Sequence, residues 1–109
     1  MPIDKWSDKI SVVHLADDPQ FTEDVQGLES VIRHNISIVM DFGGVRYINS
    51  SNLSRLLKLR KQLSTADARM ILCGLNNQIW GVFLITGLDK IFEFSDNVPT
   101  ALATMQMES

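Results

Sequence analysis

The sequence is poor in several features that would assign it to a specialised class of protein. Its 109 residues include one cysteine, Cys73, so no internal disulfide can form, and a reducing cytoplasm is the expected compartment. No apolar run approaches the roughly 20 residues of a membrane-spanning helix, so membrane insertion is not expected. The first residues, 1–5, lack the basic segment and apolar run of a secretory signal peptide.

An excess of basic residues is also missing. The chain carries 10 Lys and Arg against 13 Asp and Glu, a formal net charge of −3, so a nucleic-acid partner is not expected. His14, His34 and Cys73 form no metal-ligand spacing, so neither a metal site nor a cofactor is predicted. What remains is an ordinary globular composition, 45% apolar, and a length that suits one domain over residues 1–109.

Segments typical of strands and of helices alternate along the chain. The predicted strands are short β-branched or apolar runs, and they are an opening strand near Trp6 and the segments 10–15, 36–41, 69–73 and 91–94. The predicted helices are residues 19–32, 52–65, 78–86 and a last helix that begins at 96–99 and runs towards 107. Short links between them favour right-handed crossovers. The predicted fold class is therefore α/β, with one sheet of about four to five mostly parallel strands.

Several residues mark the expected ends of these elements. The run Asp17–Pro19 predicts a helix start, with an Asp N-cap and Pro at the first helical position, and Asn35 is a plausible left-handed stop. The pair Gly43–Gly44 is interpreted as a tight turn that ends the preceding strand. Asn76–Asn77 is expected to cap the third helix, and Gly87 to end it.

Apolar residues at helical spacing indicate which helix faces are buried. On the second helix the residues expected to face the core are Leu53, Leu56, Leu57, Leu59 and Leu63, and on the third they are Ile79, Val82, Phe83 and Ile85. Trp80 and Leu84 are also apolar but do not fit this stripe. Either the C-terminal helix or a loop covers Trp80, or the pair forms an exposed patch that anchors a partner, and the sequence favours neither.

The segment Tyr47–Leu53 places two serines between two asparagines, where a predicted strand gives way to a predicted helix. Such side chains accept hydrogen bonds from the free N–H groups of a helix start, so one interpretation is capping by Asn49 or Ser50. A second interpretation is chemistry on the hydroxyl of Ser51. Because Ser51 lies in no G-x-S-x-G motif and so small a domain offers little pocket, a hydrolase is not expected.

The same segment resembles a known family. Residues 41–53, read Asp-Phe-Gly-Gly-Val-Arg-Tyr-Ile-Asn-Ser-Ser-Asn-Leu and followed by a leucine-rich basic helix, resemble the core motif of STAS domains. STAS domains are the family of bacterial anti-sigma factor antagonists, in which a strand ending in Asp-Leu-Ser precedes Ile-Asp-Ser-Ser-Gly-Leu. Residues 77–79 and 86–92 are similar to the family's third helix and its Thr-Gly-Leu stop. The resemblance covers roughly residues 10 to 105.

The resemblance implies a sheet with strands in near-sequential order, helices mainly on one face, and a domain that binds a protein and catalyses nothing. The implied partner is a kinase-type anti-sigma factor that phosphorylates the second serine of the pair, Ser51. The unphosphorylated domain would capture the kinase, and the phosphorylated domain would release it. The residues expected to contact the partner are Asn49, Ser50, Asn52, Ser54, Arg55, Trp80 and Leu84.

Departures from the family pattern keep two other functions open. Asn49 replaces the family's Asp, Asn52 replaces its Gly where the partner would approach closely, and residues 16–20 lack the usual Gly-Glu-Leu/Ile-Asp loop. These differences favour an unswitched STAS interaction module, such as a scaffold or a transporter accessory subunit. A small enzyme or ligand-binding domain that uses Ser51 is the third hypothesis, and it requires a pocket with a base in reach. A weak homodimer is left open.

Overall fold

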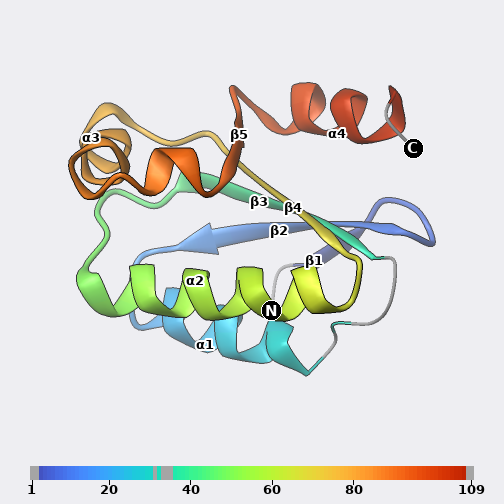
Figure 1. The fold of residues 1–109 in the computed structure, drawn as a ribbon, viewed down its shortest axis with the longest axis horizontal. Helices are drawn as coiled ribbons and strands as arrows, with labels where there is room; N and C mark the ends of the chain where they lie inside the picture. Colours follow the sequence, from blue (N-terminus) through green and yellow to red (C-terminus); the bar gives the residue numbers. More distant parts are fainter. Residues whose placement is uncertain (1–2, 31, 33–35, 108–109) are drawn as a thin grey trace.

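Five strands form one mixed sheet in the order β1-β2-β3-β4-β5 (Figure 1). The computed structural model describes residues 3–30, 32 and 36–107. The strands are β1 (Ile3–Lys5), β2 (Ile10–Ala16), β3 (Ser37–Gly44), β4 (Arg69–Cys73) and β5 (Glu93–Ser95). Edge strand β1 runs antiparallel to β2, and each later strand is parallel to the one before it. The predicted fold class is therefore confirmed, including the sequential order that the family resemblance implied.

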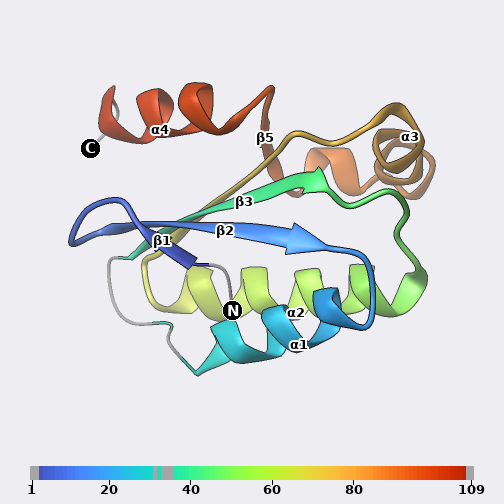
Figure 2. The ribbon, with the colours of Figure 1, turned by 180° about the vertical axis from the view of Figure 1, so that it is seen from behind.

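Helices cover both faces of the sheet, but unequally (Figures 1 and 2). The helices are α1 (Gln20–Glu29), α2 (Ser50–Thr65), α3 (Asn77–Thr86) and α4 (Val98–Met107), with a short 3₁₀ helix η1 (Leu88–Lys90). Because successive side chains of a strand point to opposite faces, neighbouring residues separate into two cores. Val13, Met40 and Leu72 join the larger core, which includes α1, α2 and α3. Val12, Val39 and Ile71 meet Ala101 and Met105 of α4 on the other face.

The end of β3 differs from the sequence-based prediction. We expected Gly43–Gly44 to form a turn after Asp41, whereas the strand continues to Gly44, and Ala16 pairs with Gly44 after an irregularity in register. A Cβ atom on Gly44 would lie 2.8 Å from the carbonyl oxygen of Leu15. This glycine is thus needed for close approach of two strands rather than for a turn.

Other element boundaries also differ from the prediction, and helix α2 begins at Ser50 instead of residue 52. The opening strand is Ile3–Lys5, and Trp6 follows it as an exposed residue. The last strand begins at Glu93, not at residue 91, because η1 is followed by Ile91, whose N–H donates to the carbonyl of Leu88. Helix α1 ends at Glu29 instead of residue 32, and the predicted stop at Asn35 lies outside the described residues, as does His34.

Two residues that we placed in the core are exposed. Leu57 of α2 is 37% exposed because it lies one position beyond Leu56, on the flank of the buried stripe. Ile85 of α3 is 89% exposed, since it lies two positions after the buried Phe83 and about half a helical turn carries it to the solvent side. Periodicity alone overestimated the width of both apolar faces.

Edge strand β1 is joined to the sheet by a histidine between two carboxylates. His14 of β2 lies with Nδ1 2.8 Å from an oxygen of Asp41 in β3 and with Nε2 2.8 Å from an oxygen of Asp4 in β1. A neutral imidazole has only one N–H, so this arrangement suits the imidazolium form, which donates from both nitrogens. The hydrogen bond to Asp41, followed by that to Asp4, raises the pKa of His14 above its ordinary 6.5.

This arrangement predicts a stability that depends on pH. Because the pKa of His14 is higher in the folded chain, its contribution is fully present below the unfolded value of 6.5 and is lost as pH rises through the folded pKa. Urea unfolding should therefore show a fall in the free energy of unfolding over this window. The His14→Gln variant should lack most of that fall, and Asp4→Asn should lack part of it. Equal pH dependence in all three proteins would contradict the assignment.

Candidate functional site

The start of α2 is fixed by a reciprocal pair of asparagines. Asn49 is the N-cap, with extended backbone (φ −117°, ψ 175°), and its side-chain oxygen accepts from the N–H of Asn52 at 2.8 Å. The side-chain oxygen of Asn52 in turn accepts from the N–H of Asn49 at 3.1 Å. These two bonds form a capping box built from two amides, a variant of the usual Ser/Thr and Glu/Gln pair. The prediction that Asn49 or Ser50 caps this helix is confirmed for Asn49.

The carboxylate of Asp18 joins this capping box to the start of α1. One oxygen accepts from the side-chain amides of Asn52 at 2.9 Å and Asn49 at 3.3 Å. The other accepts from the hydroxyl of Thr22 at 2.7 Å and from its N–H at 3.0 Å. The Thr22 hydroxyl, with the amide donors, holds the pKa of Asp18 below its ordinary value. Asp18 therefore orients both asparagines from the neighbouring helix.

The capping of α1 itself corrects a prediction. We expected an Asp N-cap with Pro19 at the first helical position, but the helix begins at Gln20 and Pro19 occupies the N-cap position without a side-chain hydrogen bond. Asp18 reaches the third helical residue, Thr22, from one position further back. The acidic residue thus performs the expected capping, and its second oxygen remains available for α2.

The lead into α2 is held at two further points. Asp17 accepts from the N–H of Arg46 at 2.8 Å and from its Nε at 2.7 Å, and this pairing lowers the pKa of Asp17. Asn76 caps α3 by accepting from the N–H of Ile79 at 2.8 Å, while its side-chain NH₂ donates to the carbonyl of Arg46 at 3.0 Å. The starts of α1, α2 and α3 are therefore connected through one short segment.

The segment between β3 and α2, residues 45–49, lies beyond the carboxyl ends of the parallel strands (Figure 1). It leaves both serines free. Ser50 and Ser51 are exposed at the first two helical positions, and within the described part of the chain neither hydroxyl has a hydrogen-bond partner. Ser54, one turn further along, is exposed as well. Because the two asparagines cap the helix, the serine hydroxyls have no structural task here.

Two residues of the predicted contact set are not placed as expected. Asn52 is only 2% exposed, so the expectation that it adds bulk on the docking surface is corrected: its amide faces Asn49 and Asp18. Arg55 is partly buried and faces the side-chain amide of Gln26 on α1. With the amide oxygen of Gln26 oriented towards Arg55, that oxygen accepts from the two terminal guanidinium nitrogens at 3.0 and 3.1 Å. The serines and Asn49 remain as the exposed members of this end of α2.

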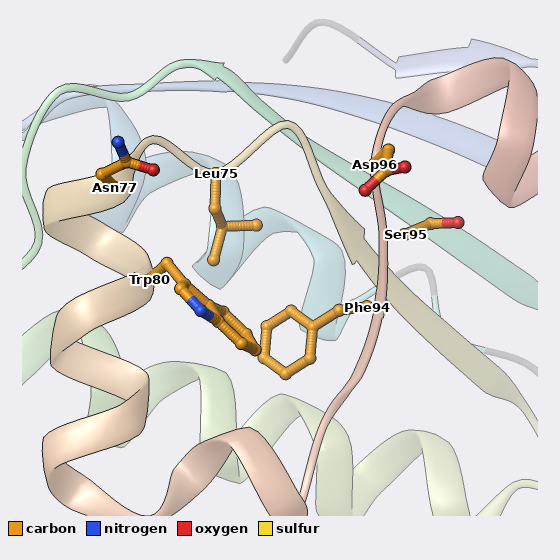
Figure 3. A pocket seen from close by; sticks show the side chains of 6 residues that line it. All are labelled: Leu75, Asn77, Trp80, Phe94, Ser95 and Asp96. Carbon is orange, nitrogen blue, oxygen red and sulfur yellow. The ribbon is translucent and has the colours of Figure 1, made fainter.

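Trp80 and Leu84 lie on the outer side of α3, the arrangement that the exposed-patch interpretation requires. Trp80 is 36% exposed and Leu84 49%. Phe94 of β5 covers one edge of Trp80, with ring centroids 4.9 Å apart at 83°. The two rings line a hollow of about 300 Å³ together with Leu75, Asn77, Ser95 and Asp96 (Figure 3). Ser50 and Ser51 do not line this hollow.

The geometry that catalysis by Ser51 requires is not seen. The hydroxyl is not hydrogen-bonded to a histidine or carboxylate among the described residues. Within that same part of the chain no cluster of three potential metal ligands occurs. The thiol of Cys73 is buried, which raises its pKa to about 12 and makes it a poor nucleophile. No described helix is both long and apolar enough to cross a bilayer.

Known proteins share this sequence pattern and this fold. The model of the STAS domain family matches residues 8–101. A Bordetella bronchiseptica protein named "Putative anti-sigma factor antagonist BtrV" is 32% identical over 69 residues, which are 63% of this chain and 60% of that protein. The likeness thus extends over less than two thirds of the relative's length.

Two solved structures illustrate the similarity of fold. An anti-sigma-factor antagonist (STAS) domain protein from Planctomyces limnophilus superimposes with a TM-score of 0.79 at 15% identity, covering 89% of this chain and 91% of that one. The Bacillus cell fate determinant SpoIIAA in its phosphorylated form gives 0.68 at 15% identity, covering 94% and 96%. At such identities the superpositions establish the fold alone.

The capping box yields a test of stability. Replacing Asn52 by Ala removes one bond to the N–H of Asn49 and leaves an Asp18 oxygen with one donor fewer. We expect a loss of about 1–2 kcal/mol in the free energy of unfolding, measured in urea. Ser54→Ala, at an exposed position of the same helix, is the matched control and should stay within about 0.5 kcal/mol. Equal effects of the two substitutions would show that Asn52 does not organise the helix start.

Proposed function

Because the chain belongs to the STAS domain family, we propose that it is an anti-sigma factor antagonist that binds a kinase-type anti-sigma factor and is released when Ser51 is phosphorylated. The proposal describes a protein-binding regulatory domain rather than an enzyme, acting in the cytoplasm with its ATP-dependent partner. One observation carries it: Ser51 presents an exposed hydroxyl, to which no described residue is hydrogen-bonded, at the second position of α2, the serine position of the family motif.

The physical setting of Ser51 suits a phosphate. Free N–H groups and the helix dipole favour an anion at this end of a helix. Asn49 and Asn52 already form the cap, so modification of Ser51 breaks no bond of the capping box. The phosphate adds about −1.5 to −2 charges to the surface that the partner would cover. The switch therefore acts at the interface and leaves the fold intact.

The two departures from the family motif, Asn49 in place of Asp and Asn52 in place of Gly, depend on each other and are compatible with this proposal. Asn49 and Asn52 satisfy each other's backbone N–H, and both donate to Asp18. Asp18 thus brings a carboxylate within 3.3 Å of the side-chain amide of Asn49, the position at which the family motif has Asp. A Gly at position 52 would lose the reciprocal bond, which gives a physical reason for the two amides to occur together.

Phosphorylation can be tested directly. The chain is incubated with its cognate anti-sigma factor kinase and ATP, and the modified residue is identified by mass spectrometry. We expect phosphate on Ser51, loss of the signal in Ser51→Ala, and full modification of the matched control Ser50→Ala. Phosphate on another residue, or none at all while the complex still forms, would refute the switch.

An unswitched interaction module remains the second candidate, and the exposure of Trp80 and Leu84 favours it. The two functions differ in which substitution weakens the complex. For the switched antagonist, Ser51→Asp should lower affinity for the kinase at least tenfold, measured by titration calorimetry. For the unswitched module, Ser51→Asp should bind like the wild type, whereas Trp80→Ala should lose affinity.

A further inference from the structure

Charge is distributed unevenly between α2 and the rest of the chain. The sixteen residues of α2 include four basic residues and no acidic residue, and the basic residues are Arg55, Lys58, Arg60 and Lys61. All 13 acidic residues lie elsewhere, against six basic ones. A net negative chain therefore carries one positive helix.

The chain itself neutralises little of this charge. Lys58 lies 3.8 Å from Glu29, and because the lysine side chain is 63% exposed, solvent screens this pair and Lys58 still presents positive charge. Arg60 donates its Nε to the carbonyl of Ile91 at 3.0 Å, a neutral acceptor that leaves the positive charge in place. Lys61 is exposed and has no ion-pair partner among the described residues. The outer side of α2 thus offers positive charge to a binding partner.

Apolar side chains lie beside these cations. Leu57 and Ile91 are both exposed. Leu57 precedes Arg60 by three residues and so lies on the same side of α2, while the bond from Arg60 holds Ile91 against that side. The same side of α2 also carries Ser50, Ser54 and Lys61. Ser54 lies four residues after Ser50, and Lys61 lies seven residues after Ser54. We call this set, Ser50, Ser54, Leu57, Arg60, Lys61 and Ile91, the α2 face.

We propose that the α2 face binds an acidic segment of the partner protein, whose carboxylates meet Arg60 and Lys61 and whose apolar side chains cover Leu57 and Ile91. The inference rests on the proposed function, since it describes how the anti-sigma factor is recognised. A protein segment fits better than nucleic acid or an anionic membrane. Those partners present extended negative surfaces, which the acidic remainder of this chain would repel.

The α2 face also gives a physical reason why phosphorylation of Ser51 would release the partner. Ser51 lies at the N-terminal end of the α2 face, next to Ser50. At a rise of about 1.5 Å per residue, position 51 lies roughly 13–15 Å along α2 from Arg60 and Lys61, beyond the roughly 8 Å Debye length at physiological salt. A phosphate there would therefore act on the part of the acidic segment that extends along the helix towards Ser54 and Ser50. Repulsion of the acidic segment would then release the partner without any change of fold.

The test uses a labelled synthetic amphipathic peptide of Glu and Leu, with the Leu residues at helical spacing, and the same peptide with Gln in place of Glu. Fluorescence anisotropy measures binding to the full chain. We expect the Glu peptide to bind at least tenfold more tightly than the Gln peptide, and Lys61→Glu or Leu57→Ser to weaken binding at least tenfold. Amide shifts in NMR spectra should map the contact to α2.

The matched control is Lys9→Glu, which makes the same charge change near Met105 of α4, on the other side of the sheet. It should alter binding by less than threefold, and melting curves confirm that each variant is folded. Equal losses for Lys9→Glu and Lys61→Glu, or tighter binding of duplex DNA or anionic vesicles than of the peptide, would overturn the proposal. If the α2 face binds the peptide but no kinase modifies Ser51, only the proposed switch fails.

Discussion

The carboxylate of Asp18 is the contact on which the candidate site depends. It accepts from Thr22 on α1 and from Asn49 and Asn52 at the start of α2, so two helices begin around one anion. Asp17 and Asn76 add bonds to the backbone and side chain of Arg46, which brings α3 to the same place. The segment before α2 is thereby held from three sides, although it belongs to neither a strand nor a helix.

This arrangement separates the capping of α2 from the two exposed serines at its start. A helix start needs side chains to satisfy its free N–H groups, and serines often do this. Here the two asparagines take that role, and the hydroxyl of Ser51 stays exposed and unbonded among the described residues. A modification of Ser51 can therefore change what α2 binds while its cap and core persist. The acid-free α2 face gives such a modification a positive surface to act upon.

Much of the fold could be predicted from the sequence, because β-branched runs and helical spacing are set by burial. Strand β4 and the Asn76 and Gly87 ends of α3 lie where the pattern placed them. The errors have local causes. Gly44 continues β3 because of its contact with Leu15, which no pattern within one strand reveals, and Ile85 faces solvent because α3 is buried on one narrow side. The exposed serine was foreseen, but Asp18 was not, since 31 residues separate it from Asn49.

The central claim is that the phosphate acts at the interface rather than on the fold. It is tested most directly by comparing the chain that carries phosphoserine at position 51 with the unmodified chain, in one experiment on affinity for the cognate anti-sigma factor. The account predicts a loss of at least tenfold in affinity, with NMR shifts confined to the start of α2 and its neighbours. Unchanged affinity would contradict it, as would a loss accompanied by shifts throughout the core.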